Sequence, residues 1–230
     1  MALNRSYSEN TLSQIKTLMQ AQADPHRAAR MKAYMKNHFE FLGIDSPKRK
    51  LLVKEIQQNI YSFNPSDFQT LVKELWNQPY REYQYLVFDL GYSKISKMDQ
   101  LWIPFFEQLV LQKSWWDTVD GLSAHFIGLI LKRNPELVEP YCMKWIEHDS
   151  FWIQRTAIIC QLFFKDQCQF ELLKNLILLK ADSKEFFIQK ACGWALRQHA
   201  KTNANQVRTF VNQYSLPKLT VREATKHIKE

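Results

Sequence analysis

The chain has 230 residues, a length that suits one large domain or one short array of helical repeats. It contains only 5 glycines and neither G-x-G-x-x-G nor G-x-x-x-x-G-K-S/T, which argues against proteins built on glycine-rich phosphate loops. The 31 basic and 23 acidic side chains give a formal net charge of +8, which fits a polyanion-binding protein and a merely soluble basic protein equally well.

The cysteines and the N-terminal residues bear on the cellular compartment. Cys142, Cys160, Cys168 and Cys192 include no C-x-x-C pair and no histidine at a matching ligand distance, so we interpret them as reduced thiols of a cytoplasmic protein. The first residues, MALNRSYSEN, lack the apolar core of a signal peptide. No uncharged apolar run reaches about 18 residues, so we expect no membrane span.

Signals for helix starts recur at short intervals along the chain. We expect an N-terminal helical segment over residues 8–42. After it, a polar capping residue is followed directly by a first-turn proline at Ser46-Pro47, Asn64-Pro65 and Asn134-Pro135. Between such marks, apolar residues lie three and four positions apart, which predicts amphipathic helices.

One short segment recurs at a fixed spacing. Residues 151–157 read FWIQRTA and residues 186–192 read FFIQKAC, so that Gln154 and Gln189 are 35 positions apart. Trp115-Trp116 aligns with the start of the first copy, and Gln84 fits one further copy upstream, both more weakly. A period near 35 with two helices in each unit is typical of HEAT-like arrays.

The repeat determines the expected fold. Each helix pair has to bury its apolar face against its neighbours, so we expect an all-α fold, a right-handed α–α superhelix whose second helices line a concave face. We expect one domain, residues 1–230, with five or six repeats over residues 43–215 and a basic capping helix over residues 216–230.

Three of the repeats carry polar and aromatic side chains that a plain array does not need. Ser114 suits the N-cap of a helix that begins at Trp115, and on that helix Trp116 and Asp120 share one face as i and i+4. One repeat later Arg155 lies near the same level. Two repeats later a single helix face carries three further candidates, Lys190, Trp194 and Arg197.

These residue types together fit a nucleic-acid surface. Lysine and arginine neutralise phosphates without reading sequence, and indole faces attract cations. A carboxylate weakens phosphate binding, so Asp120 needs another purpose. Cleavage of an N-glycosidic bond passes through an oxocarbenium-like sugar, whose positive charge a carboxylate stabilises.

Plainer interpretations stay open at this point. Trp115 is expected in the core, Trp116 can serve packing alone, and Asp120 can be a solvated side chain. Arg155 and Lys190 can be ordinary surface charges, and His125 and His199 structural residues. The D-x-x-D spacing of Asp117 and Asp120 lacks the further carboxylates of a metal site, so we expect none. The residues alone indicate a basic helical-repeat protein with an aromatic–acidic patch that binds nucleic acid.

Longer stretches resemble one known family. Residues 113–120, KSWWDTVD, resemble the K-S-W-W-D-x-x-D signature of the AlkD-like family of bacterial DNA alkylation-repair glycosylases. Further similar stretches cover nearly the whole chain: Tyr34–Phe39, Phe41–Ile44, Ile153–Arg155, Ser183–Trp194 and Arg222–Lys229.

The resemblance implies a role for most of the candidates. Asp120 would be the catalytic carboxylate, Trp116 and Trp194 would pack around the lesion, and Arg155 would hold the DNA backbone beside it. Tyr34 would contact DNA from the N-terminal region, and with Lys113, Lys190 and Arg197 it completes the DNA-binding set that we expect.

The resemblance also implies a reaction. The protein would excise N3- and N7-alkylated purines from double-stranded DNA without flipping the base into a pocket. Such bases are cationic and depart neutral, so no general acid is needed. We expect a monomer with no metal and no organic cofactor. The alternatives are a non-catalytic scaffold that binds DNA or protein, and a metal-dependent nuclease.

Overall fold

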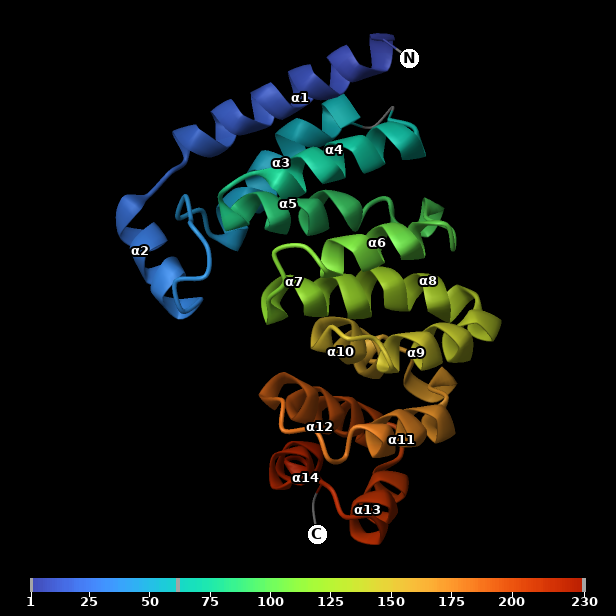
Figure 1. The fold of residues 1–230 in the computed structure, drawn as a ribbon. Helices are drawn as coiled ribbons and strands as arrows, with labels where there is room; N and C mark the ends of the chain where they lie inside the picture. The colour runs from blue at the N-terminus through green and yellow to red at the C-terminus, as the bar shows by residue number, and fades with distance from the viewer. Residues whose placement is uncertain (1, 61–62, 229–230) are drawn as a thin grey trace. The chain divides into compact units, whose positions relative to one another are not determined.

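A computed structural model describes residues 2–60 and 63–228 of the chain, which are largely helical (Figure 1). Within those residues the β-structure amounts to an isolated bridge between Glu40 and Tyr80. The predicted all-α class is therefore confirmed. The chain divides into two compact units, Met1–Lys97 and Met98–Glu230, and each is described by itself.

The helices of the first unit are α1 (Ala2–Ala21), α2 (Pro25–Tyr34), α3 (Ser46–Ile60), α4 (Pro65–Asn77) and α5 (Arg81–Gly91), followed by the 3₁₀ turn Ile95–Lys97. The second unit contains α6 (Trp102–Val110), α7 (Trp116–Asp120), α8 (Gly128–Arg133), α9 (Val138–Ile146), α10 (Phe151–Ile159), α11 (Phe170–Leu179), α12 (Phe186–Ala200), α13 (Ala204–Gln213) and α14 (Lys218–Thr225), with 3₁₀ turns at Pro135–Leu137 and Lys165–Gln167.

The helix starts that were predicted from a polar residue followed by proline differ in the structure. Asn64 caps α4, where its side chain accepts a hydrogen bond from the Asp67 amide at 2.9 Å and Pro65 occupies the first turn. Asn134 precedes only a 3₁₀ turn, and its Nδ2 donates back to the Ile130 carbonyl at 2.8 Å. The same two-residue pattern therefore starts a helix in one place and closes the preceding helix in another.

The glutamine that recurs in the repeated segment makes the same kind of hydrogen bond in each copy. In each clear copy of the motif its Nε2 donates to the carbonyl six residues earlier, in the loop that leads into the helix. Gln154 bonds the His148 carbonyl at 2.7 Å, and Gln189 bonds the Ser183 carbonyl at 2.8 Å. Gln84 bonds the Gln78 carbonyl at 3.1 Å. The glutamine thus satisfies a loop carbonyl in each of these copies.

In the first unit, a buried glutamate fixes the chain between α2 and α3. Glu82 is fully buried, and its carboxylate accepts hydrogen bonds from the amides of Leu42, Gly43 and Ile44 at 2.8–3.1 Å. Gly43 has φ +86°, and a Cβ there would lie 2.1 Å from the Asp24 carbonyl oxygen. Only glycine fits this turn.

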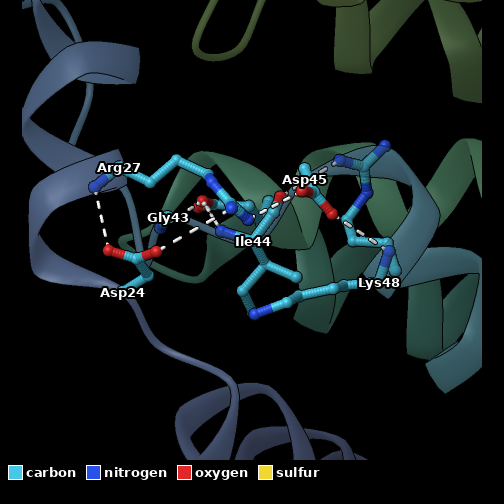
Figure 2. Close-up of polar contacts among 8 residues, drawn as sticks. Asp24, Arg27, Gly43, Ile44, Asp45 and Lys48 are labelled. Atoms are coloured by element: carbon cyan, nitrogen blue, oxygen red, sulfur yellow. Dashed lines mark hydrogen bonds and ion pairs between the residues drawn. The ribbon is translucent and has the colours of Figure 1, made fainter.

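A second polar cluster ties the start of α2 to the segment before α3 (Figure 2). Asp24 caps α2 by accepting a hydrogen bond from the Arg27 amide at 3.0 Å. The Arg27 side chain reaches Asp45, where its Nη1 lies 2.7 Å from Oδ2, and Asp45 in turn accepts from the Lys48 amide at 3.1 Å. These contacts hold the helix on which Tyr34 is the last residue.

In the second unit the repeated segments lie in successive layers. Helix α9 packs with α10, α10 with α12, and α12 with both α13 and α14 (Figure 1). The aromatic residues at the starts of α7, α10 and α12 meet: Trp115 lies 5.8 Å from Trp152 and 5.1 Å from Phe187, measured between ring centroids. The predicted stacking of HEAT-like repeats is therefore confirmed for this part of the chain.

The helix that carries Asp120 changes its winding directly after this residue. Residues Gly121–Ile127 form a π-helix, and α8 follows without a break. The Ser123 and Thr156 hydroxyls lie 2.7 Å apart in the interior and link the π-helix to α10. Single π turns within α-helices occur frequently beside functional sites.

Candidate functional site

The site is built on α7 and α10. Asp120 ends α7, and Arg155 comes from the middle of α10, one repeat later. Arg155 donates from Nε to Oδ1 of Asp120 at 2.7 Å and from Nη2 to Oδ2 at 2.8 Å. The side chains are 5% and 18% exposed respectively. This two-pronged geometry is the strongest form of an arginine–carboxylate contact.

Arg155 has a third partner. Its Nη1 donates to the backbone carbonyl of Phe187 in α12 at 2.6 Å, and its Cζ lies 6.0 Å from the ring centroid of Trp194. We expected Arg155 to hold the DNA backbone or to be a surface charge. The interpretation of Arg155 as an ordinary surface charge is corrected here, because the guanidinium is buried and bonded to Asp120 and Phe187. A contact between Arg155 and the DNA backbone stays a prediction.

Two opposing effects act on Asp120. Burial raises the pKa of its carboxyl group above the usual aspartate value, because removal from water penalises the charged form. The hydrogen bonds and positive charge of Arg155 lower the pKa, and the charge of Asp117 raises it slightly. Burial is the larger effect. Asp120 is therefore not the solvated side chain of the plainer interpretation.

The two indoles are half-buried. Trp116 lies one turn before Asp120 on α7, and Trp194 lies on α12 beside Arg155. Trp115 was expected in the core and is also half-buried, packed against Trp152 and Phe187. Trp116 therefore lies one helical turn from Asp120, and Trp194 lies 6.0 Å from the Cζ of the arginine that binds Asp120.

The start of α7 differs from the prediction. Its N-cap is Trp115 rather than Ser114, and no side chain caps the helix. The Ser114 hydroxyl donates backwards to the Val110 carbonyl at 2.6 Å and so closes α6. Lys113 has a left-handed φ of 51° and is half-buried. The loop turns sharply at Lys113 to bring Trp116 and Asp120 into position.

Lys190 and Arg197 both pair with one residue that the sequence interpretation missed. Lys190 Nζ lies 2.9 Å from Oε1 of Glu223, and Arg197 Nη1 lies 2.7 Å from Oε2. These hydrogen bonds lower the pKa of Glu223 to about 2. A Cβ on Gly193 would lie 2.4 Å from the Cβ of Glu223, so this face of α12 packs tightly on α14.

That both cations bind DNA stays a prediction. Their charges are directed to α14, while Lys190 remains 37% exposed at its side chain. Glu223 falls within the C-terminal stretch that resembles the family, and that stretch was the one available signal for it.

Tyr34 belongs to the first unit. It is 73% exposed at the end of α2. Lys36 and Asn37 follow with left-handed φ values of 52° and 61°. The turn displays an aromatic ring at the surface, as a DNA-contacting residue requires.

The histidines have packing roles. His125 stacks on Phe163 at 4.5 Å, and burial lowers its pKa. His199 stacks on Phe170 at 4.1 Å. Among residues 2–60 and 63–228, no cluster of three or more His, Cys, Asp or Glu side chains could hold a metal ion. In the same part of the chain, no helix has the length and apolarity that crossing a bilayer requires.

Comparison with known proteins gives the class and then the family. A protein from Enterococcus faecalis, described as a predicted DNA alkylation repair enzyme, is similar in structure. It is 32% identical, with a TM-score of 0.86 over 91% of this chain and 98% of that chain. The family model for DNA alkylation repair enzymes matches residues 15–228, and the chain belongs to that family. No curated protein matches the chain.

Proposed function

We propose that this protein is a DNA glycosylase that hydrolyses the N-glycosidic bond of N3- and N7-alkylated purines in duplex DNA. The observation that carries the proposal is the Asp120 carboxylate, which is largely buried and bound by Arg155 through two hydrogen bonds, with the Trp194 ring 6.0 Å from the Arg155 Cζ. Membership of the alkylation repair family supplies the class of substrate. In this proposal the protein is a cytoplasmic monomer that binds DNA along its stacked repeats and needs no cofactor.

The chemistry suits a cationic base. Alkylation at N3 or N7 gives the purine a positive charge. When the bond to C1′ breaks, its electron pair moves to the base, which leaves neutral, while positive charge develops on the sugar. The Asp120 carboxylate stabilises that charge. Water then bonds to C1′, and its proton passes to Asp120 or to solvent.

Arg155 acts as a positioning residue. A carboxylate has about four lone-pair sites, and the two N–H groups of Arg155 occupy one on each oxygen. The remaining lone pairs stay available to a sugar cation or a water molecule. The contact fixes the carboxylate plane before the substrate arrives, which is the preorganisation that electrostatic catalysis needs.

The indoles would hold the damaged nucleotide without enclosing the base. Trp116 and Trp194 offer flat apolar faces to the deoxyribose, whose C–H groups gain positive character as the bond breaks. We propose that the base stays outside any protein pocket. The rate of excision would then change little between a methyl adduct and a bulkier N7 adduct, and a steep fall with size would contradict this point.

A non-catalytic DNA- or protein-binding scaffold is the second candidate. The observation that favours it is that both Asp120 oxygens already have partners in Arg155, as in a purely structural ion pair. The two candidates differ in whether any base is released at all.

Release of 7-methylguanine from methylated duplex DNA separates the candidates. Under the glycosylase proposal the wild-type protein releases the base, and Asp120→Asn abolishes release while duplex binding persists or tightens. Asp149→Asn, at an exposed aspartate of the same unit, is the matched control and keeps full activity. Activity is unchanged by a chelator, unlike that of a metal-dependent nuclease. A wild-type protein that releases no base would refute the proposal.

A further inference from the structure

A cavity lies in the second unit, away from Asp120. Its volume is about 260 Å³, and its lining comes from the C-terminal ends of α10 and α12, from the segment that leads into α11 and from Leu173 in the first turn of α11. It begins one helical turn beyond the candidate site, because Ile158 follows Arg155 by three residues and Gln198 follows Trp194 by four. Apolar walls come from Ile158, Leu162, Leu173 and Ala195.

Gln161 lines this cavity and has a buried hydrogen-bond donor. The residue is 4% exposed. Its Oε1 accepts from the Gln169 amide at 2.8 Å, which identifies the other terminal atom as the NH₂ group. That atom, Nε2, is buried and has no hydrogen-bond partner. Leaving such a donor unpaired costs roughly 1–3 kcal/mol, so a native structure needs a reason for it.

His199 contributes a buried acceptor. The residue is 9% exposed, and its ring is held by stacking on Phe170. Nε2 lies 2.9 Å from Oε1 of Gln206, and because an amide oxygen only accepts, Nε2 carries the hydrogen. Nδ1 is then an acceptor, and it too is buried without a partner. Two unpaired polar atoms of opposite type therefore belong to residues that line one cavity.

The character of the lining restricts the ligand. The two cations that border the cavity, Lys165 and Lys201, are exposed, so charge is available only at the rim. The buried end has neutral groups and apolar walls, which do not suit an anion. Burial raises the pKa of the Cys168 thiol to about 12, so this lining residue is a protonated thiol rather than a nucleophile. A single water occupies roughly 30 Å³, and the cavity is several times larger.

We propose that this cavity binds a nucleobase by its imide edge. The ring carbonyl accepts from Gln161 Nε2, the adjacent N–H donates to His199 Nδ1, and the ring faces contact the apolar walls. A phosphate attached to the same nucleoside would lie at the rim beside Lys165 and Lys201. The proposal does not depend on Asp120 or on glycosylase activity.

Ligand-observed saturation-transfer NMR and calorimetry with uracil and hypoxanthine test the proposal on the wild-type protein. Both heterocycles carry the imide or amide edge and are expected to bind. 1,3-Dimethyluracil lacks both ring N–H donors, and its affinity is expected to be at least about ten-fold lower. No binding of uracil or hypoxanthine at millimolar concentration, or equal binding of 1,3-dimethyluracil, would overturn the proposal and would leave the cavity to water.

Variants test the two residues separately. Gln161→Met removes the donor and His199→Phe removes the acceptor while keeping an aromatic ring on Phe170. Each is expected to weaken uracil binding about ten-fold or more. Gln167→Met, at an exposed glutamine outside the lining, is the matched control.

Comparison of uracil with uridine monophosphate distinguishes a free base from a nucleotide. Tighter binding of the nucleotide, lost in Lys165→Gln with Lys201→Gln, identifies the rim as a phosphate site, and equal binding limits the ligand to the base. Asp120→Asn is expected to bind uracil like the wild type, even if the proposed glycosylase activity fails. Loss of uracil binding in Asp120→Asn would contradict a separate site.

Discussion

Arg155 binds the carboxylate of Asp120 through two parallel hydrogen bonds of 2.7 and 2.8 Å, and the two residues are one repeat of 35 positions apart. The period of the repeat, which stacks the helices, therefore also brings the guanidinium of Arg155 to the carboxylate of Asp120. Both side chains are largely buried, so each change to this pair acts in a region of low dielectric.

Arg155→Lys is expected to move the acidic limb of the pH–rate profile to higher pH. The ammonium group cannot make both parallel hydrogen bonds, and Arg155 is what lowers the pKa of Asp120 against the effect of burial. Because the charged carboxylate is the active form, less of it remains at a given acidic pH. We expect base release near neutral pH to fall about ten-fold or more. The control is Arg222→Lys, an exposed arginine on α14. An acidic limb at the same pH in the variant and the wild type would contradict the positioning role of Arg155.

Trp194→Ala is expected to slow excision more than it weakens binding to undamaged DNA. The indole lies 6.0 Å from the Cζ of Arg155, whose guanidinium binds the Asp120 carboxylate. Single-turnover base release and fluorescence anisotropy measure the two effects on one preparation. Trp194→Phe should retain part of the rate, since a flat apolar face is kept. Equal losses in rate and affinity would reduce the indole to a docking contact.

Affinity for duplex DNA is expected to fall steeply with added salt. A phosphate-binding protein releases counterions, so the logarithm of affinity falls linearly with the logarithm of salt concentration. A lysine that contacts a phosphate contributes about 1 to that slope. Lys190→Gln is expected to change the slope by clearly less, because Lys190 pairs with Glu223. A flat salt response of the wild type would count against a phosphate-contacting face.

Glu223→Gln is expected to destabilise the protein at neutral pH by roughly 1.5–3 kcal/mol, the usual contribution of hydrogen bonds to a charged group. The pKa of Glu223 is about 2 in the folded protein, against an ordinary value of 4.5. Its lowered pKa adds stability above pH 4.5 that is lost as pH falls toward 2. Thermal unfolding of both proteins between pH 3 and 7 should therefore converge at the acidic end. A constant difference across this range would contradict the assignment.

The features that could be predicted from the sequence are those set by the spacing of residues along the chain. The helices follow from apolar spacing, and Trp116 and Asp120 share a helical face by their i, i+4 spacing. The level of Arg155 beside Asp120 follows from the period of 35. The hydrogen-bond partners of Arg155 cannot be predicted from the period, because an arginine that binds a carboxylate and one that binds DNA look the same in the sequence.

The remaining differences arise from tertiary packing. Lys190 and Arg197 lie on the helix face that contains Gly193, and the close approach of α14 there directs both cations to Glu223. The Ser114 hydroxyl could cap the start of α7 or the end of α6. With the left-handed turn at Lys113, it donates to the Val110 carbonyl at the end of α6. Neither outcome is encoded by local propensity.

The π-helix over residues 121–127 has a consequence for variation in length among related chains. A π turn accommodates an additional residue without interrupting the helix. A homologue with a one-residue deletion in this stretch could therefore form ordinary α-helical turns there and still present its carboxylate and its next helix at the same places. One-residue deletions should therefore be tolerated here, directly beside Asp120.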